Sequence, residues 1–134
     1  MAKARVYLVD DSADIRDVYQ RMINRQSDLE CVGAAESTVG LEEAVRRAGA
    51  EVAVIDLVGP DRDALEAIRA TAAAAPGCRI IAFSGHDDRE TRERATEAGA
   101  WGLVSKNQPP MALIEAIRSA VGEAGGRGAG AAKA

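Results

Sequence analysis

Five short apolar runs alternate along this chain with segments of helical period, and no other feature limits its possible folds as strongly. Val6-Tyr7-Leu8-Val9 is continuous and apolar, as in a strand buried on both faces, and the stretch from Ile15 to Ile23 then repeats its apolar residues at helical spacing. The same alternation predicts strands over 29–35, 52–55, 79–83 and 100–104 and helices over 41–48, 64–72, 87–98 and 111–121. Strands joined by helical crossovers pair in parallel, so we predict an α/β fold: a (βα)5 doubly wound sheet with helices on both faces.

Length and composition indicate one globular domain, which we predict over residues 1–124. The chain has 134 residues, of which 47% are hydrophobic and 28% are charged. This is long enough for a hydrophobic core and unlike a disordered chain. Residues 125–134 are mostly Gly and Ala without an apolar pattern, so we predict a flexible tail there.

Charge and cysteine content exclude several classes of function. The net charge of -4 argues against direct binding of nucleic acid or of an anionic membrane. No apolar run approaches the roughly 20 residues of a membrane span, and the first residues do not resemble a signal peptide. Cys31 and Cys78 lack metal-ligand spacing, and we interpret them as buried small hydrophobes, with redox sensing as the alternative. We expect a protein of the reducing cytoplasm.

Polar side chains follow four of the five predicted strands. Asp10-Asp11 follows the first, Asp56 the third, Ser84 the fourth and Ser105-Lys106 the fifth. Ligands of open α/β sheets bind outside the carboxyl ends of the strands, so these groups are expected at one rim. Clustered carboxylates repel one another, and a divalent cation with oxygen ligands, such as Mg²⁺, relieves that repulsion. A metal, a carboxylate, a hydroxyl and a lysine together are suited to phosphoryl transfer.

Four segments of the chain resemble the receiver domain of two-component response regulators, over essentially residues 4–123. The matching segments are Val6 to Asp11, Val54 to Pro60, Phe83-Ser84-Gly85 and Gly99 to Lys106. The resemblance implies a flavodoxin-like (CheY-like) sheet with strand order 2-1-3-4-5. It also implies a response regulator that accepts a phosphoryl group and acts as a phosphorylation-controlled switch.

The resemblance implies a role for each polar residue at the rim. Asp56 corresponds to the phosphoacceptor, Lys106 pairs with the phosphoryl group and Ser84 donates a hydrogen bond to it. The Mg²⁺ ligands implied, with Mn²⁺ as a substitute, are Asp10 through water, Asp11 directly, Asp56 and the backbone carbonyl of Val58. His86 and Val58 correspond to positions that modulate the lifetime of the acyl phosphate, although His86 is equally interpreted as a solvated loop residue. Such a domain catalyses its own phosphorylation and dephosphorylation.

The resemblance also implies partners. These are a sensor histidine kinase or a histidine phosphotransfer protein upstream, and downstream either another protein or a second copy of the chain. The downstream contact would use the face of the fourth helix, fifth strand and fifth helix, where Trp101 and Leu103 are predicted to share one side of the strand. Trp101 is either an interface anchor or local packing. Arg16, Arg21 and Arg25 of the first helix are interpreted either as residues that help to dock an acidic partner surface or as ordinary surface residues.

The chain departs from the family pattern at two notable positions. Leu103 stands where the family usually has Tyr or Phe, which puts the usual aromatic switch in doubt. Asn107 stands where proline usually follows the lysine, as in the NarL/FixJ-like receivers that precede a helix-turn-helix domain. The alternatives are therefore a receiver fragment of a DNA-binding transcription regulator, a phosphorylation-independent interaction module, and a Mg²⁺-dependent phosphatase or phosphotransferase for small molecules.

Overall fold

The computed structural model describes residues 2–57 and 63–124. Within them, strands and helices alternate as predicted. The strands are β1 (Ala4–Val9), β2 (Leu29–Ala35), β3 (Val52–Asp56), β4 (Arg79–Ser84) and β5 (Gly102–Ser105), and the helices are α1 (Ala13–Arg25), α2 (Leu41–Ala48), α3 (Asp63–Ala74), α4 (Arg89–Ala98) and α5 (Met111–Ala124). The tail predicted over 125–134 lies outside the described residues.

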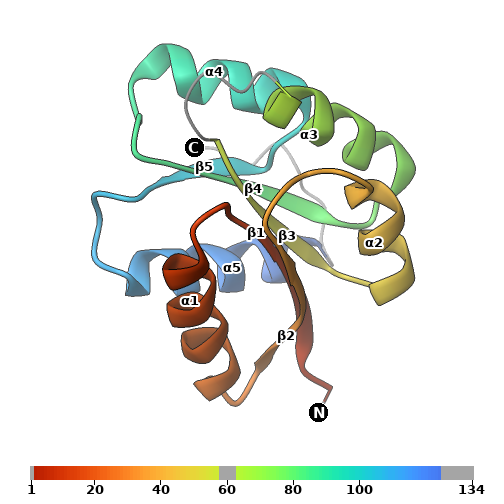
Figure 1. The fold of residues 1–134 in the computed structure, drawn as a ribbon, viewed down its shortest axis with the longest axis vertical. Coiled ribbons are helices and arrows are strands. Elements are labelled where there is room, and N and C mark those ends of the chain that lie inside the picture. Colours follow the sequence, from red (N-terminus) through yellow and green to blue (C-terminus); the bar gives the residue numbers. More distant parts are fainter. Residues whose placement is uncertain (1, 58–62, 125–134) are drawn as a thin grey trace.

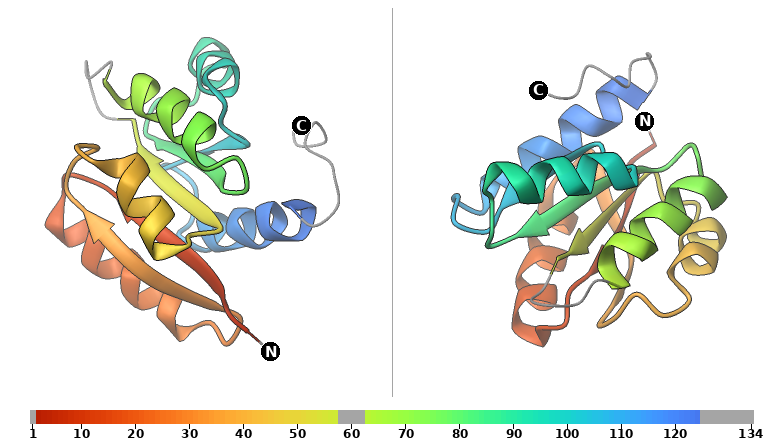
Figure 2. Two further views of the ribbon diagram at one scale, coloured as in Figure 1. Left: turned by 90° about the vertical axis from the view of Figure 1, so that its right-hand side faces the viewer. Right: turned by 90° about the horizontal axis from the view of Figure 1, so that it is seen from above.

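The strands form one parallel sheet in the order β2-β1-β3-β4-β5. Helices α1 and α5 cover one face, and α2, α3 and α4 cover the other (Figures 1 and 2). The predicted doubly wound architecture and strand order are confirmed. Strands β1 and β3 are neighbours at the centre, so the residues that follow them lie side by side.

Each face of the sheet has its own hydrophobic core. Val54 lies in the core beneath α1 and α5, and the next residue, Ile55, lies in the core beneath α2, α3 and α4. Both side chains are fully buried, because successive residues of a strand point to opposite faces. This two-sided burial explains why the strands are continuous apolar runs in the sequence.

The fourth helix is anchored by small residues. Ala95 and Ala98 are buried, and Gly99 ends the helix with φ of 121°. A Cβ atom at Gly99 would lie only 2.9 Å from Cβ of Ala72 on α3. The contact between α3 and α4 therefore requires glycine at this position, for conformation and for space.

The edge strand β2 contains a register shift. Val6 pairs with Cys31 but Tyr7 pairs with Gly33, so one residue of β2 is left out of the pairing. A Cβ atom at Gly33 would lie 2.5 Å from the Tyr7 ring, so the glycine gives that ring its space. The N–H of Cys31 donates to Oδ1 of Asn24 on α1, at 2.8 Å.

Candidate functional site

The carboxyl edge of the sheet gathers the polar residues that the sequence singles out. Asp10 and Asp11 follow β1, Asp56 ends β3, Ser84 ends β4 and Lys106 follows β5. All the strands run in the same direction, so these positions meet at one edge. The backbone closes the edge between β4 and β5, because the N–H of Lys106 donates to the carbonyl of Ser84 at 2.8 Å.

Lys106 is the centre of the cluster. Its Nζ lies 3.0 Å from Oδ2 of Asp10 and 2.8 Å from Oδ1 of Asp56. The same ammonium lies 5.2 Å from the ring centroid of Phe83, a cation–π distance, and Phe83 in turn packs edge to face against Tyr19. The ammonium is thus held by two carboxylates and an aromatic face.

The three carboxylates are close enough to share one cation. One oxygen from each of Asp10, Asp11 and Asp56 lies within 4.8 Å of the others. Asp10 is fully buried and Asp56 is 7% exposed, whereas Asp11 is exposed. Oδ2 of Asp56 is buried and has no hydrogen-bond partner within the described residues. A buried carboxylate oxygen without a partner is costly, and a hard divalent cation would satisfy it, so the donor set fits such an ion.

The charge balance of the site is negative. Burial raises the pKa of Asp56 to about 6; the hydrogen bond from Lys106 lowers it only in part, and the charge of Asp10 raises it further. Burial alone would lower the pKa of Lys106, but its hydrogen bonds with Asp56 and Asp10 outweigh this, and the pKa is raised. The lysine therefore stays charged, and the excess negative charge is borne by the carboxylates.

Backbone contacts fix the Asp10–Asp11 turn at the start of α1. The N–H of Ser12 donates to Oδ1 of Asp10 at 2.9 Å, and the Ser12 hydroxyl caps the helix by accepting from the N–H of Ile15. Nη1 of Arg16 donates to the Asp10 carbonyl at 2.7 Å. The sequence interpretation of Arg16 as a docking residue overlooked this contact. The sequence signal that could have predicted this contact was the position of Arg16 in the first turn of α1, close to the acidic turn.

Ser84 is buried, and its hydroxyl is engaged locally. Its Oγ accepts a hydrogen bond from the N–H of His86 at 2.9 Å. The His86 side chain is exposed. Val58, the other predicted modulatory residue and a predicted metal ligand through its carbonyl, lies outside the described residues.

Trp101 and Leu103 pack on different faces of the sheet. Both are partly buried, Trp101 against the core beneath α1 and α5 and Leu103 against the core beneath α2, α3 and α4. The prediction that they share one face of a strand is therefore wrong. Strand β5 begins at Gly102, so Trp101 precedes it and does not follow its two-residue alternation.

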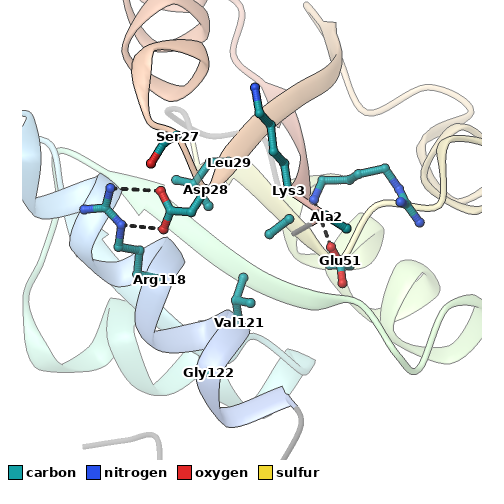
Figure 3. Close-up of a pocket in the computed structure, with 11 residues that line it drawn as sticks. Ala2, Lys3, Ser27, Asp28, Leu29, Glu51, Arg118, Val121 and Gly122 are labelled. Atoms are coloured by element: carbon teal, nitrogen blue, oxygen red, sulfur yellow. Dashed lines mark hydrogen bonds and ion pairs between the residues drawn. The ribbon is translucent and has the colours of Figure 1, made fainter.

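A hollow lies at the opposite, amino edge of the sheet (Figure 3). There Arg118 of α5 donates to both carboxylate oxygens of Asp28, at 2.9 and 3.1 Å, and Oε1 of Glu51 accepts from the N–H of Arg5 at 2.9 Å. The Asp28 and Glu51 carboxylates at this hollow thus already accept hydrogen bonds from protein donors, and these charges are satisfied within the protein. The carboxyl edge is therefore the better candidate for function.

The sequence matches one family model over most of its length. The model described as "Response regulator receiver domain" matches residues 6–118. Among curated proteins, the chain is 31% identical over 126 residues to protein-glutamate methylesterase/protein-glutamine glutaminase 2 of Hahella chejuensis, covering 91% of this chain and 33% of that protein. It is 32% identical to the uncharacterized transcriptional regulatory protein YxjL of Bacillus subtilis, covering 91% and 56%. The chain thus spans about a third to a half of the length of these relatives.

Solved structures with the same fold include a two-component response regulator of the LuxR family from Aurantimonas. It is 30% identical, with a TM-score of 0.83, and the match covers 90% of this chain and 86% of that one. The response regulator domain of Thermotoga maritima CheB is 26% identical, with a TM-score of 0.79 and coverage of 90% and 97%. No helix within residues 2–57 and 63–124 has the length and apolar character needed to span a membrane.

Proposed function

The chain belongs to the response regulator receiver domain family, and on this premise we propose that it accepts a phosphoryl group from a phosphohistidine onto Asp56. Homology with response regulators is consistent with a phosphorylation-controlled switch in a two-component system. The donor would be a sensor histidine kinase or a histidine phosphotransfer protein, and the reaction would take place in the cytoplasm.

The observation that carries this proposal is the inequivalence of the two Asp56 oxygens. Oδ1 is paired with Lys106 at 2.8 Å, while Oδ2 is buried without a hydrogen-bond partner among the described residues. A lone pair of one Asp56 oxygen forms the new P–O bond as the P–N bond of the phosphohistidine breaks, the electron pair of that bond returns to the imidazole nitrogen, and the other oxygen stays available to the cation. Lys106 then neutralises phosphoryl oxygens, and Ser84 donates its hydroxyl hydrogen to one of them.

The acidic turn and Asp56 are suited to Mg²⁺, with Mn²⁺ as a substitute. We propose that Asp11 and Asp56 bind it directly and Asp10 binds through water, because both Asp10 oxygens already accept hydrogen bonds, from Ser12 and Lys106. The carbonyl of Val58 is proposed as a further ligand. When bound, the metal supplies positive charge that offsets the charge of the phosphoryl oxygens.

The proposed output is a change in the surface formed by α4, β5 and α5. A downstream protein or a second copy of the chain would bind this surface differently before and after phosphorylation. Because the chain spans only part of its longer relatives, a place within a larger transcription regulator is the second candidate.

Intact mass after incubation with Mg²⁺ and phosphoramidate tests the proposal. We expect the gain of one phosphoryl group, absent in Asp56→Asn and absent when the metal is chelated. Asp28→Asn is the matched control, because it removes a surface carboxylate at the opposite edge of the sheet and should be labelled like the wild type. No labelling of the wild type, under conditions that label another receiver domain, would overturn the proposal.

A further inference from the structure

The loop between β4 and α4, residues 85–88, is held by side chains from two other segments. Nδ2 of Asn107, in the turn after β5, donates to the carbonyl of Gly85 at 3.2 Å. Nε of Arg92, on α4, donates to the carbonyl of Asp87 at 3.0 Å. Neither of these side chains makes a hydrogen bond to Asp10, Asp11 or Asp56 in the described structure, so both lie outside the site already described.

The backbone that carries the Asn107 side chain is itself held by hydrogen bonds. The backbone N–H of Asn107 donates to Oγ of Ser105 at 3.0 Å, and Ser105 is buried at the end of β5. The preceding residue, Lys106, is joined through its N–H to the carbonyl of Ser84. The amide of Asn107 therefore reaches the 85–88 loop from a backbone that is itself tied to the ends of β4 and β5.

Arg92 bonds to two different elements at once. While Nε donates to Asp87, Nη1 of the same guanidinium donates to the carbonyl of Leu103 on β5, at 3.1 Å. A guanidinium presents its donors in a rigid fork, so the two carbonyls are held in a fixed relation. If the loop moved away from β5, at least one of these bonds would break.

The loop and the Ser84 hydroxyl are connected. Oγ of Ser84 accepts from the N–H of His86, which lies within the loop. In the described structure Ser84 makes no hydrogen bond to Asp56. A turn of the hydroxyl toward a group on Asp56 would change its contact with His86, and the loop backbone would have to adjust.

We propose that Asn107 and Arg92 are positioning residues that hold the 85–88 loop in its resting arrangement and so set how readily Ser84 turns toward a phosphoryl group on Asp56. The inference rests on the proposed function. Each bond favours the resting state over the rearranged state. Because an exposed hydrogen bond contributes little net free energy, removing one is expected to shift that equilibrium by about two- to tenfold.

The first measurement is amide hydrogen exchange in the resting protein, without metal or phosphodonor. Asn107→Ala and Arg92→Met are each expected to speed exchange of the His86 amide by about two- to tenfold. Arg94→Met is the matched control, because Arg94 lies on the same helix, pairs with Glu90 at 2.7 Å and makes no hydrogen bond to residues 85–88 in the described structure. Arg92→Lys keeps the positive charge but lacks the paired guanidinium donors, so its His86 amide should exchange as fast as that of Arg92→Met.

The second measurement is the apparent affinity for beryllofluoride with saturating Mg²⁺, a stand-in for the phosphoryl group. Both loop variants should bind it about two- to tenfold more tightly than the wild type, with Mg²⁺ affinity unchanged, and their free energy of unfolding in urea should fall by no more than the same factor accounts for. If Asn107 and Arg92 served only the stability of the fold, their removal would lower the free energy of unfolding and leave the ratio of the beryllofluoride affinity to the Mg²⁺ affinity as in the wild type.

Two results would overturn the inference. One is unchanged His86 exchange in both variants. The other is an effect of Asn107→Ala alone, which would show that Asn107 acts through its neighbour Lys106 and not through the loop. Failure of the proposed function would look different: the wild type would not be labelled by phosphoramidate, whereas the exchange measurement reports on the loop regardless of that chemistry.

Discussion

Oδ1 of Asp56 lies 2.8 Å from Nζ of Lys106, while Oδ2 of the same carboxylate is buried without a hydrogen-bond partner among the described residues. One ammonium therefore faces the charge of Asp56 together with that of Asp10, and the exposed Asp11 lies nearby. This imbalance leads to two predictions about the metal-free protein.

The first prediction concerns Asp56→Asn and pH. The pKa of Asp56 is about 6 in the folded protein against 3.8 for the ordinary group, so the folded state holds its proton more tightly. The contribution of Asp56 to the free energy of unfolding is therefore fully present below about pH 4, where the carboxyl group is protonated. This contribution is lost as the pH rises through about 6 and the group ionises. Asparagine carries no such charge. In EDTA, Asp56→Asn should gain stability relative to the wild type between pH 4 and 7, by roughly 1–3 kcal/mol.

Urea unfolding of both proteins at several pH values measures this difference. Carboxylates away from this cluster contribute equally to both proteins and cancel. Adding Mg²⁺ at pH 7.5 should stabilise the wild type and leave Asp56→Asn nearly unchanged. A stability difference that does not vary with pH would show that Asp56 is not destabilised by its surroundings.

The second prediction concerns Lys106→Met. Its removal leaves the buried carboxylate of Asp10 and that of Asp56 without their cationic partner, so the metal-free protein should lose about 1–3 kcal/mol. The same change makes the site more negative, so Mg²⁺ should bind about tenfold more tightly or better. Phosphoryl transfer should nevertheless fall.

Titration calorimetry with Mg²⁺ and the mass assay separate these opposite effects. Lys3→Met is a suitable control, because Lys3 lines the hollow at the amino edge, away from the carboxylates. Weaker Mg²⁺ binding by Lys106→Met would contradict the expectation that the positive charge of Lys106 opposes metal binding.

A third prediction compares two glycines. Gly99→Ala places a methyl group 2.9 Å from Cβ of Ala72 at φ of 121°, so it should destabilise the fold by about 1–3 kcal/mol. Gly122 lies within α5, and a methyl group there would meet no atom of another element within 4 Å, so Gly122→Ala should stabilise by about 0.5–1 kcal/mol. Thermal unfolding of both variants tests this. Equal effects would argue against the close approach of α3 and α4.

A fourth prediction concerns thiol reactivity. Burial raises the pKa of the Cys78 thiol to about 12, with a further contribution from Glu51, and burial also raises the pKa of Cys31. The thiolate is the reactive form, so iodoacetamide at pH 8 should modify both slowly, and half-buried Cys31 before buried Cys78. Peptide mass mapping gives the order. If Cys78 in the native protein were labelled as fast as in the denatured protein, the prediction of slow labelling would be wrong, and redox sensing would again be a candidate role.

The sequence predicts the framework of the site well, because strand ends are visible in it. An apolar run that stops at a charged residue places Asp10 and Asp56 at the same edge once the strands are parallel. The strand order that makes β1 and β3 neighbours came from family resemblance and not from periodicity. The position of Lys106 between two carboxylates depends on its rotamer, which no sequence pattern specifies.

Contacts between side chains of different elements were beyond sequence reasoning. Asn107 and Gly85 are 22 positions apart, and Arg92 and Leu103 are 11 apart, so neither pair follows a helical or strand period. The error on Trp101 has a related cause. Its face was inferred from an alternation that begins only at the next residue, where β5 starts.

The register shift in β2 affects how copies of this protein behave toward one another. An edge strand with a regular row of free N–H and C=O groups is a template for strands of other molecules. Here one residue drops out of the pairing, and the Cys31 N–H is already bonded to the Asn24 side chain. The edge is therefore interrupted and partly capped, which disfavours sheet extension from molecule to molecule and helps the protein to remain dispersed at high concentration.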